Sequence, residues 1–354
     1  MNERAAVVGL RLPGTAIEQV QDHLDELTAL AFSAGVQVVE RFVQSRESPL
    51  AGTFIGPGKA EEIAQAVADL SLDVVIFDDE LAPAQVRNLE KIVDAKVIDR
   101  TELILDIFAR KAQTFESKIQ VEVAQLEYRL TRIMGKGVVL SRLGGGVGTR
   151  GPGEQKLEVD RRRIRDRIVL LKRKLTGISR RRSVARSGRL GFPVGAVVGY
   201  TNVGKSTLIN RLAKAELHVE NKLFATLDAA TRRVELSDQK KVLLTDTVGF
   251  IRKFPPQLAA SFRSTIEESL EADFLLHVAD ASHPNLAEQV STVERFLGDL
   301  GAREKRVIRV LNKVDCVKHA VALQRVLPDG DWLAVSAKTG AGIALLKERM
   351  RETL

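Results

Sequence analysis

The stretch Gly199-Tyr200-Thr201-Asn202-Val203-Gly204-Lys205-Ser206 decides the fold of this 354-residue chain, because it has the spacing G-x-x-x-x-G-K-[ST]. Ala196-Val197-Val198 before it reads as a strand, and residues 206–212 after it read as a helix. In this context the glycines turn backbone N–H groups toward phosphates. Lys205 then reaches the β and γ oxygens, and the Ser206 hydroxyl binds Mg²⁺. The pattern predicts a P-loop nucleotide-binding domain.

Two further motifs predict phosphate and metal contacts. Apolar residues 242–244 are followed by Asp246-Thr247-Val248-Gly249, which puts a carboxylate near the metal and a glycine N–H near the γ-phosphate. Between this motif and the first lies Phe224-Ala225-Thr226-Leu227-Asp228. Thr226 is the expected ligand of Mg²⁺ and the γ-phosphate there, ahead of Thr231. We therefore predict metal ligands Ser206 and Thr226, catalytic residues Lys205, Thr226 and Gly249, and a further nucleotide contact at Thr207.

Two later motifs predict guanine as the base. Asn312-Lys313-Val314-Asp315 follows the apolar run 307–311, and the Asp315 carboxylate can accept from both N1 and the exocyclic amine of guanine. Ser336-Ala337-Lys338 follows a last strand and brings the Ala337 N–H to guanine O6. Four motifs in this order predict a guanine-nucleotide site.

Two positions bear on hydrolysis. Phe250 stands where small GTPases that resemble Ras place a water-orienting glutamine, and its side chain neither donates nor accepts a hydrogen bond. Intrinsic hydrolysis should therefore be slow, and a partner or a rearranged switch should supply what is missing. Asn202 is a candidate to hold a K⁺ ion beside the phosphates, as in some related GTPases; the alternative is that it braces the loop by hydrogen bonding to backbone.

Charge is strongly segregated along the chain, although the formal net charge is only +8. Residues 1–109 carry −10, residues 110–189 carry +15 and the remainder carries +3. A dense basic middle predicts a polyanion partner, with a solvated helix face as the alternative. RNA or DNA is favoured over a membrane surface because we expect no exposed Trp or Phe anchors on the basic helices. The predicted RNA contacts are Arg142, Arg150, Arg161, Arg162, Arg163, Arg180, Arg181 and Arg182.

Periodicity predicts an α/β chain in three parts. Residues 1–109 alternate strands (6–12, 36–43, 74–77, 96–98) with helices (17–34, 59–70, 84–93), which predicts a small α/β domain. Residues 110–189 carry two 4-3-4-3 apolar seams that predict a basic antiparallel helical hairpin around a glycine-rich loop, 135–153. Residues 190–354 alternate again and predict a P-loop GTPase domain with a doubly wound sheet.

A weaker signal lies in Gly56-Pro57-Gly58-Lys59, which places glycines and a lysine at a helix start, where anions bind. It lacks the full phosphate-loop spacing. A plain strand-to-helix turn is favoured over a second nucleotide site.

Several classes are excluded. The single cysteine, Cys316, forms no internal disulfide, and the five histidines have no metal-ligand spacing. No stretch reaches the ~20 apolar residues of a membrane span, and the amino end is no signal peptide. We expect a cytoplasmic protein, monomeric when free.

The chain resembles the HflX family. The resemblance is carried by the basic hairpin with Ser141-Arg142-Leu143-Gly144-Gly145-Gly146 and Gly148-Thr149-Arg150-Gly151-Pro152-Gly153-Glu154, and by a GTPase bearing Asp246-Thr247-Val248-Gly249-Phe250. It implies a Mg²⁺-dependent GTPase that binds the large (50S) ribosomal subunit, with the hairpin loop reaching rRNA. It also implies rescue or splitting of stalled or idle ribosomes under stress. Only 343–354 follows Ser336-Ala337-Lys338, so the extra carboxyl-terminal domain of longer members is expected to be absent.

Two other functions compete. The first is an RNA-binding assembly or chaperone factor in which the nucleotide is mainly a structural ligand; Phe250 favours it, and the set Lys205, Ser206 and Asp246 opposes it. The second is a regulatory GTPase that acts on a protein complex away from ribosomes.

Overall fold

The computed structural model describes residues 3–140, 152–187, 191–213, 223–224, 227, 230–236, 240–261, 272–299, 301–302, 305–317 and 331–354. Packing divides the chain into two compact units, residues 1–110 with 118–175 and residues 111–117 with 176–354. Each unit is described by itself. Among the predicted site residues, Arg142, Arg150, Ala225, Thr226, Asp228 and the side chains of Arg181 and Arg182 lie outside the described residues.

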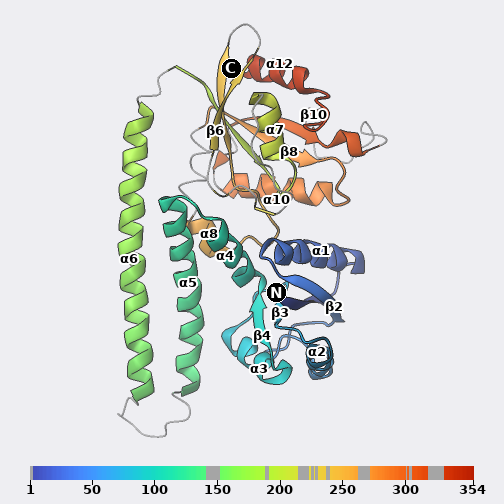
Figure 1. Cartoon of the computed structure of the whole chain (residues 1–354), viewed down its shortest axis with the longest axis vertical. Coiled ribbons are helices and arrows are strands. Elements are labelled where there is room, and N and C mark those ends of the chain that lie inside the picture. Colours follow the sequence, from blue (N-terminus) through green and yellow to red (C-terminus); the bar gives the residue numbers. More distant parts are fainter. Residues whose placement is uncertain are drawn as a thin grey trace. The chain divides into compact units, whose positions relative to one another are not determined.

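The first unit contains a four-stranded parallel sheet in the order β2-β1-β3-β4 (Figure 1). Its strands are β1 (Arg4–Arg11), β2 (Gln37–Ser45), β3 (Val74–Phe77) and β4 (Lys96–Asp99), and its helices are α1 (Ile17–Ser33), α2 (Pro57–Leu70), α3 (Pro83–Val93) and α4 (Arg100–Lys111). The predicted small α/β domain is confirmed. Helix α4 was not predicted, because it begins directly after β4 without a glycine or proline to mark a boundary.

The start of α2 supports the strand-to-helix turn at Gly56–Lys59. The Lys59 ammonium pairs with Glu62 one turn on, at 2.6 Å, and lies over the ring of Phe42. The Lys59 ammonium therefore already has a carboxylate and an aromatic partner within the first unit. Nothing in these contacts favours a second nucleotide site.

Two long helices follow, α5 (Phe115–Leu140) and α6 (Pro152–Ser187). Within the first unit they run antiparallel, since Glu122 pairs with Arg167 at 2.8 Å and the Ile133 carbonyl accepts from Arg161 at 3.2 Å. The two predicted seams are partly buried: Ile119 and Val123 of the first and Ile168 and Leu171 of the second are buried, and the other six seam residues are half-buried (Leu126, Leu130, Ile133, Ile164, Leu175 and Ile178). The helices are longer than predicted: α5 continues to Leu140 and α6 begins at Pro152, so both ends of the predicted loop 135–153 are helical, and residues 141–151 lie outside the described residues. Glycine inside a helix costs only about 1 kcal/mol, so Gly135 and Gly137 do not end α5.

Helix α5 has a second buried face that the sequence analysis missed. The Tyr128 hydroxyl donates to Asp99 at the end of β4 at 2.8 Å, and the Arg132 guanidinium pairs with the same carboxylate at 2.7 Å. Packing therefore joins the hairpin to the amino-terminal sheet. The division into three domains at 109/110 and 189/190 is kept only as a proposal.

The second unit contains a six-stranded sheet in the order β10-β9-β8-β5-β7-β6, parallel except for β6. Its strands are β5 (Val194–Gly199), β6 (Ala230–Glu235), β7 (Lys241–Asp246), β8 (Phe274–Asp280), β9 (Arg306–Asn312) and β10 (Trp332–Ala334), with helices α7 (Lys205–Ala213), α8 (Pro256–Ser261), α10 (Leu286–Asp299) and α12 (Ile343–Thr353). The doubly wound sheet is confirmed. The edge strand β6 was not predicted.

Strand β8 is buried along its whole length and forms the centre of the core with β5. Because β5, β7, β8, β9 and β10 are parallel, their carboxyl ends meet at one edge, where ligands of such sheets bind. Four predicted motifs follow these ends. None of the described helices is long and apolar enough to cross a membrane.

Candidate nucleotide-binding site

The phosphate loop joins β5 to α7, as predicted. Two positions in it need glycine: a Cβ at Gly199 would lie 2.2 Å from the Val278 carbonyl oxygen, and one at Gly204 would lie 2.4 Å from Asn312 Nδ2. Both glycines also have positive φ, +155° and +92°. The neighbouring strand and the Asn312 side chain therefore dictate where the loop runs.

The cation of the loop lies inside the domain. Lys205 is 7% exposed, and its ammonium donates to the carbonyls of Gly199 at 3.1 Å and Tyr200 at 2.9 Å. Burial lowers the pKa of the Lys205 side chain to about 8, while the carboxylate of Asp246 opposes this shift. The ammonium is held ready for phosphate oxygens, which would restore its pKa by supplying negative charge.

The predicted metal ligand on α7 meets the carboxylate that ends β7. Ser206 Oγ donates to Asp246 Oδ2 at 2.6 Å, and Asp246 is only 2% exposed. A hydroxyl and a carboxylate beside a phosphate loop are the oxygen donors that Mg²⁺ prefers. This donor set fits the ion, with Asp246 holding Ser206 in place.

The predicted base-recognition motifs are brought together at the ends of β9 and β10. Asn312 donates to the Val203 carbonyl at 2.8 Å and accepts from the Ala337 N–H at 3.0 Å, so it ties the phosphate loop to the Ser336–Lys338 segment. The Ser336 hydroxyl donates to the exposed Asp315 carboxylate at 2.6 Å. This bond lowers the pKa of the Asp315 carboxyl below its usual value, which keeps it an acceptor for the base at neutral pH.

The loop also contacts the segment that holds the predicted switch threonine. Thr201 Oγ1 accepts from the backbone N–H of Phe224, at 3.3 Å, two positions before Thr226 in the sequence. Thr231 lies in β6, with its hydroxyl 3.0 Å from that of Thr245 on β7. The preference for Thr226 over Thr231 stays a prediction.

Phe250 points into the core rather than toward the phosphate loop. It is 6% exposed and its ring packs on Phe296 of α10, with centroids 4.7 Å apart. Its side chain therefore orients no water in this structure, which agrees with the absence of a polar group at this position.

Two supporting residues escaped the sequence analysis. Asp280, at the end of β8, pairs with Lys313 at 2.6 Å, and Lys313 also donates to the Asn202 carbonyl at 2.8 Å. Arg211 on α7 donates to the carbonyls of Ala337 and Lys338. Asp280 could have been predicted from the sequence, because it ends a buried strand as Asp246 does. No sequence pattern marks Arg211.

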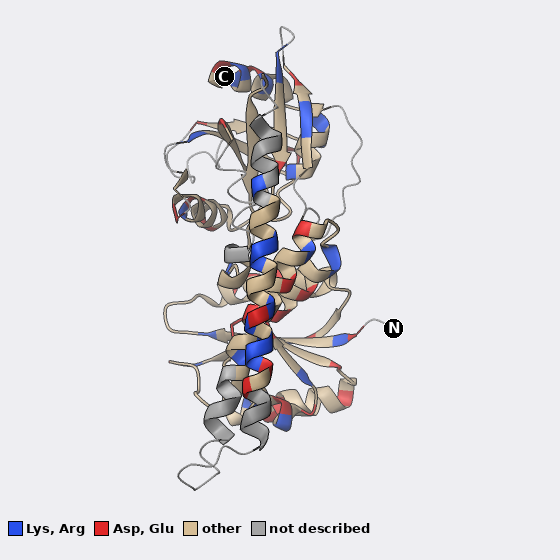
Figure 2. Cartoon of the chain, turned by 90° about the vertical axis from the view of Figure 1, so that its left-hand side faces the viewer, with Lys and Arg blue, Asp and Glu red and all other residues tan. Residues whose placement is uncertain are grey.

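Of the predicted RNA-contacting arginines on α6, Arg161 and Arg163 pair with Glu158 and Asp160, at 3.4 and 3.9 Å, and Arg162 and Arg180 are exposed. Along α6, Figure 2 shows Lys and Arg recurring over the described part of the helix. Arg161, Arg167 and Lys172 make contacts to α5 or to neighbouring carboxylates. Among the described residues, the exposed Arg162 and Arg173 have no hydrogen-bond or ion-pair partner.

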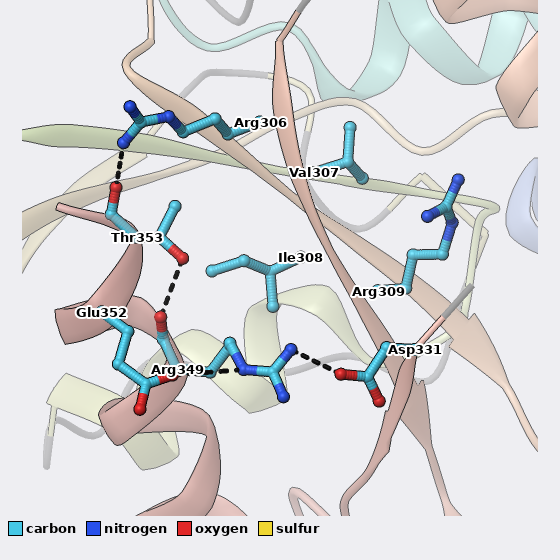
Figure 3. A pocket seen from close by; sticks show the side chains of 8 residues that line it. All are labelled: Arg306, Val307, Ile308, Arg309, Asp331, Arg349, Glu352 and Thr353. Atoms are coloured by element: carbon cyan, nitrogen blue, oxygen red, sulfur yellow. Dashed lines mark hydrogen bonds and ion pairs between the residues drawn. The ribbon is translucent and has the colours of Figure 1, made fainter.

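A pocket of about 540 Å³ lies at the opposite edge of the second sheet, where β9 begins and α12 ends (Figure 3). Its arginines are engaged: Arg349 pairs with Asp331 at 2.6 Å, and Arg306 donates to the Thr353 carbonyl. The pocket is remote from all four motifs. We assign it no ligand.

Comparison with known proteins identifies the family. Three family profiles match consecutive parts: "GTP-binding GTPase N-terminal" (residues 21–109), "GTP-binding GTPase Middle Region" (111–189) and "50S ribosome-binding GTPase" (194–313). GTPase HflX of Lacrimispora saccharolytica is 50% identical over 92% of this chain and 77% of its own length. The chain belongs to the HflX family of GTPases. It is therefore a P-loop GTPase, as predicted.

Other relatives agree. GTPase HflX of Escherichia coli is 43% identical over 94% of this chain and 79% of its own length. The crystal structure of a GTP-binding protein from Sulfolobus solfataricus in complex with GDP matches with a TM-score of 0.50 at 23% identity, covering 99% of this chain and 98% of that one. The last similarity supports the fold.

Proposed function

We propose that this HflX-family GTPase binds Mg²⁺-GTP at the carboxyl edge of its second sheet and that hydrolysis times its residence on the large (50S) ribosomal subunit, where it acts on stalled or idle ribosomes. The observation that carries the nucleotide site is the Ser206–Asp246 bond of 2.6 Å beside the buried Lys205, with Asp315 and Ser336 at the same edge. These side chains come from four separate motifs. A packing role alone does not explain a phosphate loop, two metal-type oxygens and an ionised base acceptor together.

Each group has a defined task in this proposal. Ser206 and Thr226 would hold Mg²⁺, with Asp246 orienting Ser206, and the bound ion would supply positive charge to the phosphates. Lys205 binds the same phosphates, the Gly249 N–H binds the γ-phosphate, and Asp315 and Ala337 select guanine. Because Phe250 orients no water, unassisted turnover is slow and a partner completes the site.

Asn202 is proposed to hold a K⁺ ion near the phosphates, where positive charge would stabilise the transition state. Among the described residues its side chain makes no hydrogen bond, which weighs against the alternative that it braces the loop. Turnover in potassium and in sodium at equal ionic strength tests this; equal rates would remove the ion from the proposal.

The proposed binding to the ribosome is supported by the charge of the middle region. Residues 110–189 carry +15, and α6 presents unpaired Arg162 and Arg173 to solvent. rRNA phosphates fit such a surface better than a protein partner does. Arg161 is reassigned by this argument to packing, since it is 20% exposed and bonded to α5.

The deciding experiment measures GTP turnover by the full chain alone, with large subunits and with small subunits. The proposal expects stimulation by large subunits and little by small ones. Equal turnover in all three would favour an RNA-binding assembly factor with a structural nucleotide, or a GTPase acting away from ribosomes. We further propose that the protein works in the cytoplasm and is monomeric when it is not bound to a ribosome.

A further inference from the structure

The segment after β7 is bonded directly to the phosphate loop. The Phe250 N–H donates to the Gly199 carbonyl at 3.1 Å, and the Thr201 N–H donates to the Phe250 carbonyl at 2.7 Å. Tyr200 and Phe250 therefore pair as a short parallel bridge. Residues 247–252 are called the switch segment below.

The bridge brings the switch segment against the phosphate-binding ammonium. A Cβ at Gly249 would lie 2.7 Å from Thr201 Cα and 2.9 Å from Lys205 Nζ, so backbone fills the space beside that nitrogen. A γ-phosphate bound by both Lys205 and the Gly249 N–H needs an oxygen between them, about 2.7–2.9 Å from each donor. The glycine must move outward to admit it.

Side chains that the phosphate-loop pattern does not specify hold the segment in this position. The Tyr200 hydroxyl accepts from the Arg252 N–H at 2.6 Å, which closes the bridge from the other side. Phe250 packs on Phe296 at 4.7 Å, and Phe254 meets the same ring at 6.1 Å. The G-x-x-x-x-G-K-[ST] pattern leaves the second position open, so a tyrosine there is not needed to bind phosphate.

We propose that Tyr200 and Phe250 form a latch that holds the switch segment closed over the phosphate loop, so that binding GTP has to open it and binding GDP does not. Tyr200 is in this sense a positioning residue that sets the preference between the two nucleotides. A ligand shifts an equilibrium only by its differential affinity for the two states, and the γ-phosphate supplies that difference. The inference rests on the assignment of Lys205 and Gly249 to the phosphate site.

The test is Tyr200→Phe in the full chain, which removes the hydroxyl acceptor and keeps the ring. Affinities for GDP and for a non-hydrolysable GTP analogue are measured with Mg²⁺. Loss of one neutral hydrogen bond from the closed state should raise affinity for the GTP analogue relative to GDP by about two- to tenfold. Tyr128→Phe, at the chain's only other tyrosine, should leave that ratio unchanged.

Phe296→Leu gives an independent measurement, because it loosens the aromatic contact from α10 without touching the loop. It should move the ratio in the same direction. In the unaltered protein, hydrogen exchange at the Phe250 amide should be slow with GDP and faster with the GTP analogue. The latch is refuted if GDP binds but neither variant changes the ratio of affinities for the GTP analogue and GDP. It is also refuted if the Phe250 amide exchanges equally slowly with the two nucleotides. If the unaltered protein binds neither nucleotide, the proposed nucleotide site falls and the latch falls with it.

Discussion

Tyr128 on α5 donates its hydroxyl to Asp99 at the end of β4, at 2.8 Å. Asp99 is fully buried and also accepts from the Leu81 N–H and from Arg132. Desolvation raises the pKa of the Tyr128 phenol, with the Asp99 charge adding to the effect, so the tyrosine stays a donor. This bond fastens the hairpin to the amino-terminal sheet.

Tyr128→Phe should destabilise the protein by about 1–3 kcal/mol, because a buried carboxylate loses one of its donors. Urea denaturation followed by circular dichroism measures the loss. Lys172→Gln is the control, since it breaks a pair between an exposed lysine and Glu127 and should cost about 0.5 kcal/mol or less. Equal losses of unfolding free energy in the two variants would show that the Tyr128–Asp99 bond stabilises the protein no more than an exposed ion pair does.

Asp315→Asn should shift base preference from guanine to xanthine. The amide no longer accepts from the guanine amine, whereas its N–H₂ can donate to the xanthine carbonyl. The Ser336 hydroxyl can still donate to the new side-chain oxygen, so the loop should keep its place. Competition between GTP and XTP measures the change; continued preference for GTP would refute the assignment of Asp315.

Replacing the unpaired arginines Arg162 and Arg173 by Gln should weaken binding to large ribosomal subunits and reduce its salt dependence. Each lost phosphate contact should lower the log–log slope by about 0.7–0.9. Affinity for GTP should not change.

The matched control is Arg167→Gln with Lys172→Gln, which removes the same charge from side chains already paired with Glu122 and Glu127. It should leave the slope nearly unchanged. If the two double variants reduce the salt dependence equally, the net charge of the helix, rather than the unpaired Arg162 and Arg173, determines binding to the ribosome.

His277 should make the protein less stable in acid. Burial, with Arg309 and Lys205 adding to it, lowers the pKa of this imidazole to about 3 from 6.5. Between these values the unfolded chain binds more protons than the folded one, so stability is complete above pH 6.5 and declines as pH falls toward 3. The decline from this group should reach about 2 kcal/mol between pH 7 and pH 5.

Denaturation midpoints at pH 7, 6 and 5 for the unaltered protein and for His277→Leu measure the effect. The variant has no proton to gain at this position, so its stability should fall less over the same range. Parallel curves would mean that His277 does not contribute. His277 also packs against Trp332, at 5.4 Å between centroids, so the variant's baseline at pH 7 is compared separately.

The sequence by itself determined the candidate nucleotide site. Its four motifs are local: each follows a buried strand, and parallel strands bring their carboxyl ends to one edge whatever the rest of the chain does. Candidate residues with a short, fixed spacing, such as Gly199 to Ser206, can therefore be identified from their order alone. The two seams of the hairpin are also local, since a 4-3 spacing defines one face of a helix.

Only the tertiary structure decided which charges are free and which contacts join the parts. Arg161 and Arg162 are neighbours in sequence, yet one is bonded to α5 and the other is exposed, because successive helical residues point about 100° apart. The Tyr128–Asp99 bond and the Tyr200–Phe250 bridge link residues 29 and 50 positions apart. No local pattern encodes such pairs, since they depend on how strands and helices pack once the core has formed.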